Sequence, residues 1–482
     1  MNIKKHTKIV ATISDRKCEP EFIRELHEAG MNVVRINTAH QMPEDTERVI
    51  KNIREVSDKI AILVDTKGPE IRTKNVENPI EVKAGDKVIV KGGEGESKDN
   101  VLFLDYAGVA NDVPAGSSLL IDDGELELKV ESVSEEGLVT VVCNDGAIKN
   151  RKSVNVPGVT ITLPAITAKD RKFIEWSAEN DIDFIAHSFV RNAADVLAVQ
   201  EILDSKNSKA KIIAKIENHD GVQNIDEILD HAYGVMVARG DLGIEVPAAK
   251  IPGIQRDLVS ACVSRKKPVI IATQMLHTMI QNPRPTRAEV SDVANAIYQN
   301  TDAIMLSGET AYGDYPVEAV KVMTSIAQEV EAARDHKNNN LAVTLTPYQV
   351  PAFLAEAAVK AADQDELEVK AIVTDSMTGR TARYLAAFRC NKPVLAKCHT
   401  PNVMRELALS YGVYADVIKG RKNKDKLVKS VLKGMVEEGT LVKEDNVVYV
   451  GGSFGVGAGT TFMEIGSVDQ LTSKNKKDQD AE

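Results

Sequence analysis

Eight short apolar runs rich in Val, Ile and Ala recur along the chain. They span residues 7–13, 32–36, 60–65, 183–188, 211–216, 234–238, 268–273 and 302–306. Continuous apolar residues predict strands that are buried on both faces. Helical patterns follow the runs, for example at 20–29, at 169–179 and from Thr286, where Glu289 completes a capping box. We therefore predict an α/β fold, a (β/α)8 TIM barrel with its active site at the carboxyl ends of the strands.

The third and fourth runs are separated by a long segment that does not follow this pattern. Residues 70–157 contain short alternating runs such as KVIVKG, SSLLI, ELELKV and LVTVVCN, separated by Gly and Asp turns. This pattern predicts a small β-barrel lid domain at 70–157, inserted after the third barrel strand. A domain over the strand ends would exclude water from a reaction; an insertion without a function is the alternative.

The α/β pattern returns in the last third of the chain. Helices are predicted at 351–362, 381–388, 402–411 and 425–438, and strands at 370–374, 393–396 and 446–451. Residues 339–472 are therefore expected to form a C-terminal α/β domain with a small doubly wound sheet. The barrel domain then comprises 1–69 and 158–338, with NNN at 338–340 as a linker. The polar tail at 473–482 is expected to be disordered.

Composition excludes several classes of protein. The chain of 482 residues has a formal net charge of -11, which argues against nucleic acid or an anionic membrane as its main partner. No apolar stretch approaches the length of a membrane span. The five cysteines are scattered and form no C-x-x-C pair, so neither a zinc knuckle nor a disulfide framework is indicated. We expect a cytoplasmic protein.

Polar residues follow five of the runs as pairs separated by one residue. The pairs are Arg35/Asn37, Asp65/Lys67, Lys215/Glu217, Arg239/Asp241 and Ser307/Glu309. Residues i and i+2 of a strand point to the same side, and parallel strands end at one edge, so these side chains should converge. Cations beside carboxylates predict a site for a phosphorylated anion with a divalent metal.

Glu217 and Asp241 are the predicted metal ligands. They follow neighbouring strands, which lie about 4.8 Å apart. Two carboxylates, completed by substrate oxygens and water, suit Mg²⁺. Gly240 and Gly243 flank Asp241 and would let backbone N–H groups approach a bound anion. A set of salt bridges at the barrel rim is the alternative interpretation.

Thr273 ends the seventh run and carries a hydroxyl at the same edge. It would bind a carboxylate or deliver a proton, with Ser307 and Glu309 extending a polar path. A threonine that only satisfies its own strand end explains the residue equally well. For the isolated histidines His40, His187 and His277, a structural hydrogen bond is the simpler interpretation.

A second candidate site lies in the C-terminal domain, where TDSMTGRTAR follows a strand and opens a helix. Backbone N–H groups, hydroxyls and a guanidinium there would cup a phosphate; the residues are Thr374, Ser376, Thr378, Gly379, Arg380 and Thr381. A capped strand–helix turn is the alternative. The Gly-rich segment at 451–461 lacks the G-K-[ST] ending, so it is not a P-loop.

Long motifs in the chain resemble those of the pyruvate kinase family. They include TKIVATI, GMNVVRIN, DTKGPEIRT, IDDGELELKV, VNVPGVTITLPAIT, HSFVR, KIEN, MVARGDLGIEV, PVIIATQML, RPTRAEVSDVANAI and LSGETAYGDYP, and cover nearly the whole sequence. The resemblance implies a barrel with a lid and a regulatory C-terminal domain, assembled as a homotetramer. It implies phosphoryl transfer from phosphoenolpyruvate to ADP, giving pyruvate and ATP, with Mg²⁺ (or Mn²⁺) and K⁺ as cofactors.

The resemblance also assigns roles to individual residues. Catalysis and substrate binding fall to Arg35, Lys215, Gly240, Asp241 and Thr273, with Ser307 and Glu309 in a proton relay. Nucleotide binding falls to His40, Arg72, Asp123 and Lys152. Mg²⁺ falls to Glu217 and Asp241, and K⁺ to Asn37, Asp65 and Thr66.

Three departures from the family pattern affect these expectations. Ala39 stands where a serine usually contributes an oxygen to K⁺, although Glu70 matches the K⁺-using pattern, so we expect K⁺ activation that is weaker or less selective. SDRKC replaces the usual GPAS near the nucleotide. His277 and Thr278 stand where Glu and Ser are usual.

Regulation and rival functions remain open at this point. The C-terminal cup lacks the basic residue that often meets a second phosphate, so we expect a phosphorylated effector such as a monophosphate, or none. A barrel lyase or aldolase with a Mg²⁺-bound enolate would share Glu217 and Asp241 but would not need Lys152. A non-catalytic metabolite sensor would bind ligands without turnover.

Overall fold

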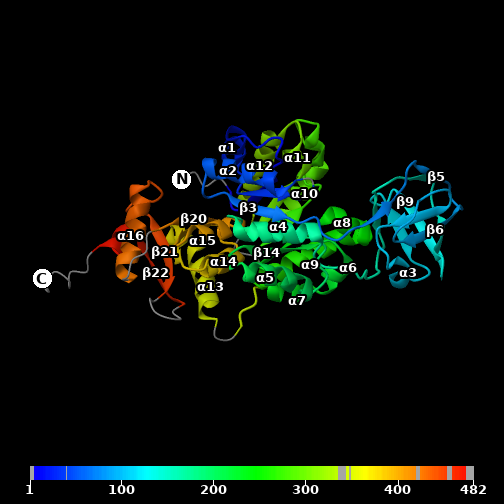
Figure 1. The fold of residues 1–482 in the computed structure, drawn as a ribbon. Helices are drawn as coiled ribbons and strands as arrows, with labels where there is room; N and C mark the ends of the chain where they lie inside the picture. Colours follow the sequence, from blue (N-terminus) through cyan, green and yellow to red (C-terminus); the bar gives the residue numbers. More distant parts are fainter. Residues whose placement is uncertain are drawn as a thin grey trace.

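The large barrel at the centre of the molecule is closed by eight parallel strands (Figure 1). This computed structural model describes residues 5–39, 41–334, 343–346, 349–418, 424–452 and 459–473. The strands are β1 (Lys8–Thr12), β2 (Val33–Asn37), β3 (Ala61–Asp65), β13 (Phe184–His187), β14 (Lys211–Ile216), β15 (Gly234–Ala238), β16 (Val269–Ala272) and β17 (Ala303–Leu306). Each predicted apolar run forms one of them, which confirms the TIM barrel.

Helices surround this barrel. They are α1 (Pro20–Ala29), α2 (Pro43–Val56), α4 (Ala168–Glu179), α5 (Ala193–Ser205), α6 (His219–Gln223), α7 (Ile225–His231), α8 (Arg239–Glu245), α9 (Ile251–Ser264), α10 (Arg287–Tyr298), α11 (Gly308–Ala311) and α12 (Pro316–Ala333). The strands are apolar throughout because alternate residues fill two cores. Val10 packs inside the barrel, for example, whereas Ile9 and Ala11 pack against the helices. The capping box of Thr286 and Glu289 begins α10 as predicted.

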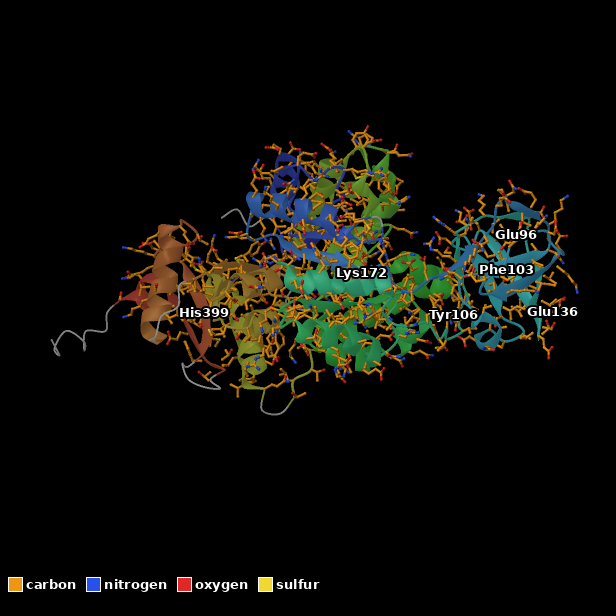
Figure 2. All side chains as sticks on the ribbon, viewed as in Figure 1. Glu96, Phe103, Tyr106, Glu136, Lys172 and His399 are labelled. Carbon is orange, nitrogen blue, oxygen red and sulfur yellow. The ribbon has the colours of Figure 1, made fainter. Side chains whose placement is uncertain are left out.

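A second, smaller closed barrel of seven strands is inserted between β3 and β13. Its strands are β4 (Ile71–Lys74), β6 (Lys87–Gly92), β7 (Val101–Leu104), β8 (Ser118–Ile121), β9 (Leu126–Ser134), β10 (Gly137–Val142) and β12 (Ser153–Asn155). The short pair β5 (Ile80–Val82) and β11 (Gly146–Ile148) and helix α3 (Val109–Asp112) complete it. Alternate apolar residues form its core, while acidic side chains such as Glu96 and Glu136 are exposed (Figure 2).

The C-terminal part forms a five-stranded sheet in the order β20-β19-β18-β21-β22. Its strands are β18 (Val369–Ser376), β19 (Val394–Cys398), β20 (Val413–Val417), β21 (Asn446–Gly452) and the antiparallel β22 (Thr460–Ser467). Its helices are α13 (Val350–Ala362), α14 (Arg380–Ala387), α15 (Pro401–Glu406), α16 (Lys424–Glu437) and α17 (Val468–Thr472). This sheet and the second barrel lie at opposite ends of the molecule (Figure 1).

The sequence analysis missed both edge strands of this sheet. β20 and β22 are partly exposed and mix polar with apolar residues, so neither shows a continuous apolar run. The predicted helix at 402–411 is shorter, because α15 ends at Glu406 and a 3-10 turn follows at Leu407–Leu409. The predicted linker at 338–340, residues 453–458 of the Gly-rich segment and the predicted tail from 474 onward lie outside the described residues.

Buried ion pairs join the C-terminal part to the amino end of the large barrel. Arg389, which is 2% exposed, donates to both carboxylate oxygens of Asp302 at 3.1 and 2.7 Å. Arg405 Nε donates to Asp183 Oδ1 at 2.7 Å. Asp183 and Asp302 directly precede β13 and β17, so both pairs lie at the end of the barrel opposite the predicted site. Within the described ranges, no helix is both long and apolar enough to cross a membrane.

Candidate active site

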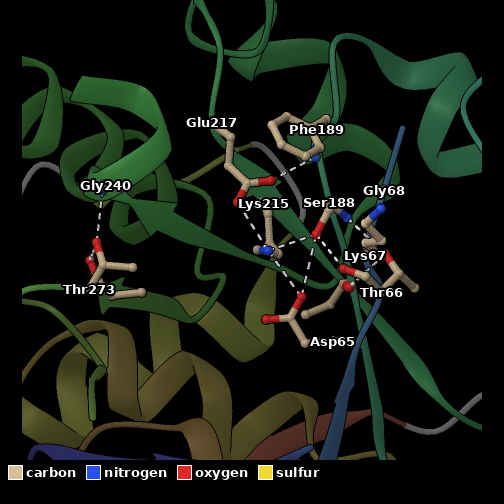
Figure 3. A network of polar contacts seen from close by, with 12 residues as sticks. Asp65, Thr66, Lys67, Gly68, Ser188, Phe189, Lys215, Glu217, Gly240 and Thr273 are labelled. Carbon is tan, nitrogen blue, oxygen red and sulfur yellow. Dashed lines mark hydrogen bonds and ion pairs between the residues drawn. The ribbon is translucent and has the colours of Figure 1, made fainter. Parts of the chain in front are cut away.

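Lys215 is at the centre of the polar cluster at the carboxyl end of the barrel (Figure 3). Its Nζ atom lies 3.0 Å from Asp65 Oδ1 and 3.0 Å from Glu217 Oε1, and it donates a hydrogen bond of 2.6 Å to Ser188 Oγ. Burial disfavours the ammonium, but the two carboxylates outweigh burial and raise the pKa of Lys215 above its usual value. The site therefore holds a fixed positive charge.

Arg35 joins the cluster through Asp65. Its Nε donates to Asp65 Oδ2 at 2.6 Å, and its Nη1 donates to Thr12 Oγ1 at 3.0 Å. Burial disfavours the ionised carboxylate, but Arg35 and Lys215 together hold the pKa of Asp65 below its usual value. One buried carboxylate thus keeps two cations close together, as the binding of a phosphoryl group requires.

Glu217 and Asp241 provide the predicted metal ligands. Glu217 is 1% exposed and its Oε2 accepts a hydrogen bond of 2.7 Å from the backbone N–H of Phe189. Burial raises the pKa of Glu217; Lys215 opposes this rise, whereas Asp241 and Asp65 add to it. Asp241 is half-buried in the first turn of α8. A further cation beside these carboxylates would relieve their mutual repulsion.

The chemistry of these donors fits Mg²⁺. Within the described parts of the chain, no group of three or more His, Cys, Asp or Glu side chains is placed to hold a metal ion. Mg²⁺ usually needs fewer, since one or two carboxylates suffice when substrate phosphates and waters complete its coordination. Glu217 and Asp241 provide that number of carboxylates.

The residues expected to bind K⁺ lie at the ends of β2 and β3. Asn37 Oδ1 accepts from Ala39 N at 3.0 Å, and Thr66 Oγ1 accepts from Ser188 N at 3.1 Å. Lys169 Nζ donates to the carbonyl oxygens of Thr38 and Ala39 at 2.6 and 3.2 Å. An ammonium therefore already uses carbonyl groups of the loop in which Ala39 replaces a hydroxyl.

Thr273 follows β16 in a left-handed backbone conformation, with φ of 68°. Such a φ is unusual for a β-branched residue and often accompanies functional sites. Its Oγ1 accepts from Gly240 N at 2.8 Å and donates to the carbonyl of Ala272 at 2.7 Å. The structure thus brings Thr273 and Gly240 together, as expected of two groups that would hold one carboxylate.

The predicted polar path from Thr273 through Ser307 and Glu309 is not a continuous chain of hydrogen bonds. The Glu309 carboxylate is 2% exposed and accepts from Ser307 N at 2.7 Å and from Leu276 N at 3.3 Å. It therefore connects the loops that follow β16 and β17. Ser307 also lines a cavity of about 660 Å³ with Arg35, and Arg16 and Lys17 of the SDRKC departure line the same cavity.

The prediction that paired polar residues after a strand point to the same side was wrong for Arg239. α8 begins directly at Arg239, so the two members of the Arg239/Asp241 pair lie on a helix and do not share a strand face. Arg239 instead donates to Asp292 Oδ1 at 2.6 Å and to the carbonyl of Thr273 at 2.7 Å. It supports the loop that carries Thr273.

In the second barrel, the two basic residues expected to bind nucleotide have acidic partners. Arg72 donates from Nε and Nη2 to Glu70 Oε2 at 3.0 and 2.7 Å. Lys152 pairs with Asp122 at 2.8 Å, which raises the pKa of Lys152, whereas Asp123 accepts from Ser153 Oγ. The sequence analysis named Asp123 and missed Asp122. His40 lies outside the described residues.

Two other predictions of local chemistry can be compared with the structure. His187, for which we expected a structural hydrogen bond, has no partner for either ring nitrogen among the described residues, and burial lowers its pKa to about 4. His277 and Thr278 depart from the family pattern noted above. Thr278 donates from N and Oγ1 to Glu289 at 2.7 and 2.5 Å. This departure therefore links the loop after β16 to α10.

The candidate phosphate cup of the C-terminal part is formed by the turn between β18 and α14. Gly379 N donates to Ser376 Oγ at 2.9 Å, and Thr381 Oγ1 pairs with Thr460 Oγ1 of β22. Thr378 and Arg380 are exposed at this turn. Thr374, by contrast, is fully buried within β18.

Sequence reasoning assigned no role to Ser188 and Phe189, which contact Lys215 and Glu217. Ser188 is the last residue of the run at 183–188 and directly follows β13, so it would have been found if single polar residues at run ends had been counted as well as pairs. Phe189 acts through its backbone N–H, and no side-chain pattern could reveal that.

The chain is similar to known proteins along nearly its whole length. The family model described as "Pyruvate kinase, barrel domain" matches residues 4–320, and "Pyruvate kinase, alpha/beta domain" matches residues 353–465. A pyruvate kinase of Borreliella burgdorferi is 50% identical over 98% of this chain and 100% of its own length. One from Geobacillus stearothermophilus is 44% identical over 98% of this chain and 82% of its own. A crystal structure of a pyruvate kinase from Cryptosporidium parvum superposes with a TM-score of 0.91 at 35% identity, covering 96% of both chains.

Proposed function

The chain belongs to the pyruvate kinase family, and from this premise we propose which of its residues perform the reaction. The enzyme is a phosphotransferase of glycolysis, which moves the phosphoryl group of phosphoenolpyruvate to ADP and yields pyruvate and ATP. Phosphoryl transfer needs positioning and charge neutralisation more than covalent catalysis. The observation that carries our proposal is the cluster of Lys215, Asp65, Arg35 and Glu217 at the carboxyl end of the barrel.

Lys215 and Arg35 are proposed to bind the transferring phosphoryl group. Both are buried and held by Asp65, so their charges are in place before substrate arrives and no solvent must be reorganised. Lys215 also stabilises the enolate that the departing phosphoryl group leaves behind. Glu217 and Asp241 would hold Mg²⁺ (or Mn²⁺), which when bound supplies further charge neutralisation for phosphate and enolate oxygens.

Thr273 and the turn at Gly240 are proposed to hold the substrate carboxylate. The hydroxyl of Thr273 already bonds the N–H of Gly240, so a carboxylate that enters here would exchange with that bond. Thr273 is also the candidate to pass a proton to the enolate carbon. Glu309 supports this role through the loop that carries Leu276, with Ser307 beside it.

Nucleotide binding is proposed for the face of the second barrel that carries Arg72 and Lys152, with Asp123 and His40. Glu70 and Asp122 hold the two cations in the structure described here. Phosphate oxygens of ADP would compete with these carboxylates for Arg72 and Lys152 as the lid closes. K⁺ is proposed at Asn37, Asp65 and Thr66.

The remaining assignments depend on the family relationship. We propose a cytoplasmic homotetramer with domain boundaries at 1–69 and 158–338, 70–157 and 339–472. The turn with Ser376, Thr378, Gly379, Arg380 and Thr381 would bind a phosphorylated effector. A kinetic screen of sugar phosphates and AMP tests this role, and flat responses to all of them would remove it.

A coupled assay with phosphoenolpyruvate, ADP, Mg²⁺ and K⁺ tests the proposed function. We expect pyruvate release that depends strictly on ADP and forms one ATP for each pyruvate. Pyruvate release without ADP would favour the lyase or aldolase alternative. Ligand binding without any turnover would favour a metabolite sensor.

A further inference from the structure

The turn that follows β13, formed by Ser188 and Phe189, contacts both charged groups at the centre of the site (Figure 3). Ser188 Oγ accepts from Lys215 Nζ at 2.6 Å and donates to the carbonyl of Thr66 at 2.7 Å. The N–H of Phe189 donates to Glu217 Oε2 at 2.7 Å. Two adjacent residues thus orient the proposed phosphoryl-binding cation and the proposed metal-binding carboxylate.

The backbone of Phe189 adopts an unfavourable conformation to make this contact. Its φ of 56° lies in the left-handed region, which bulky residues rarely occupy. Such a conformation costs on the order of 1 kcal/mol or more, so surrounding packing must hold it in place. The strained residue therefore lies next to Glu217, a proposed metal ligand.

Gly68 provides part of that packing. A Cβ atom at Gly68, where φ is 77°, would lie 2.7 Å from Phe189 Cδ2 and 2.7 Å from Ser188 Cβ. Gly68 belongs to the segment that leads from β3 into the second barrel, and its N–H donates to Asp170 Oδ2 at 3.1 Å. This segment, called the hinge segment below, therefore packs so closely against the turn that a methyl group at Gly68 would not fit.

Phe189 also faces the boundary between the two barrels. It lines a cavity of about 100 Å³ together with Val154, Val156 and Gly158 of the second barrel and its return segment. The same cavity is lined by Glu245 of α8, which accepts from Asn155 Nδ2 at 3.1 Å. A movement of the second barrel would therefore change the surroundings of Phe189.

We propose that the Ser188–Phe189 turn is a positioning element, which fixes Lys215 and Glu217 and couples them to the hinge at Gly68. This inference rests on the roles proposed above for Lys215 and Glu217. Ser188 and Phe189 act through those two residues. A movement of the lid at this hinge would then act on the charged groups through the turn that holds them.

Two glycine variants form a matched test. Gly68→Ala and Gly158→Ala both place a side chain at positive φ (77° and 74°) in the two segments that connect the barrels, but a Cβ at Gly158 meets nothing within 4 Å. We expect Gly68→Ala to lower kcat roughly 10- to 100-fold, since small misplacements of catalytic groups have effects of this size. Gly158→Ala should stay within about threefold of the parent because it adds only the backbone strain.

A second readout does not depend on turnover. Mn²⁺ affinity, measured by electron paramagnetic resonance without substrates, should fall about 10-fold in Gly68→Ala, as for other changes that disturb the support of a metal ligand. Gly158→Ala should bind Mn²⁺ like the parent. Equal kcat and equal Mn²⁺ affinity in the two variants would overturn the coupling to the hinge.

A serine pair tests the turn directly and decides the matter if Gly68→Ala does not fold. Ser188→Ala should lower kcat about 10-fold with a smaller change in the KM for phosphoenolpyruvate. Ser177→Ala in α4 is the control, because Ser177 is buried and its hydroxyl has no partner among the described residues. If both serine variants match the parent, the turn does not position Lys215. Failure of the proposed function itself would show separately, as full activity in Lys215→Met.

Discussion

The two ends of the large barrel both bury cations beside carboxylates, but the ion pair of Arg389 and Asp302 at the amino end is enclosed, whereas the pair of Arg35 and Asp65 at the carboxyl end borders a cavity. At the amino end, Asp302 accepts from Arg389 through both oxygens and also from the backbone N–H groups of Tyr411 and Val269. The space beside this pair measures about 10 Å³. At the carboxyl end, a cavity of about 660 Å³ opens beside Arg35.

This comparison shows that a buried ion pair does not by itself mark a catalytic site. Burial raises the pKa of Asp302 as it raises that of Glu217, so the direction of the shift does not separate the two ends. The two ends differ in how many hydrogen bonds the buried cation already makes to protein groups and in whether a ligand can reach it. Arg389 donates hydrogen bonds to Asp302, Asn300 and Ala386. At the carboxyl end, by contrast, a ligand has room beside the charged side chains.

Lys215→Met tests the carboxyl end and should have the largest effect. Methionine keeps the apolar length of the side chain but removes the charge that would stabilise the transferring phosphoryl group. We expect kcat to fall by at least about 10³-fold, as when other preorganised donors to a transition state are lost. The matched control is Lys8→Met at the amino end, where Lys8 Nζ donates to Val413 O. Comparable losses in the two variants would contradict the distinction between the ends.

Arg389→Met tests the enclosed ion pair of the amino end through stability. It would leave the Asp302 carboxylate buried without its cation, which typically costs about 3–5 kcal/mol. Urea unfolding followed by circular dichroism should show the loss as a lower midpoint. Lys206→Met is the control, since Lys206 and Glu179 form an exposed pair worth less than about 1 kcal/mol. An equally small change in Arg389→Met would mean that the interdomain pair contributes nothing.

Much of this architecture could be predicted because it depends on local patterns. The eight barrel strands are buried on both faces, so each reads as a continuous apolar run. Lys215 and Glu217 could be placed at the barrel mouth because β14 ends at Ile216, between them. The alternating runs of the second barrel likewise reflect strands with one buried face.

The features that escaped prediction depend on partners far away in the chain or on backbone geometry. Nothing local to Arg389 or Arg405 indicates that Asp302 and Asp183 will receive them. Arg239 was misplaced because α8 starts without an intervening loop. The left-handed φ of Phe189 is imposed by packing, so the local sequence does not predict it.

Glu217→Gln tests whether Glu217 holds a metal ion, in contrast to Asp302, whose carboxylate joins the barrel to the C-terminal part. The amide preserves the shape of the side chain but removes a charge that Mg²⁺ would use. The Mg²⁺ concentration for half-maximal activity should rise at least about 10-fold. Glu245→Gln is a nearby control, because Glu245 is half-buried on the same side of the barrel and bonds to Asn155. An unchanged Mg²⁺ requirement in Glu217→Gln would remove Glu217 from the metal site.

The smallest expected effect concerns the loop at Ala39, at the edge of the carboxyl end. Ala39→Ser would add one oxygen beside Asn37 and Asp65, where Lys169 already donates to the carbonyls of Thr38 and Ala39. One added polar contact is worth about 1 kcal/mol, so the K⁺ concentration for half-maximal rate should fall roughly fivefold. Rates measured against KCl and NaCl test this, with the exposed Ala84→Ser as control. Identical K⁺ affinity in Ala39→Ser and the parent would show that the missing hydroxyl does not weaken K⁺ activation, because the carbonyl groups held by Lys169 would then be arranged well enough without it.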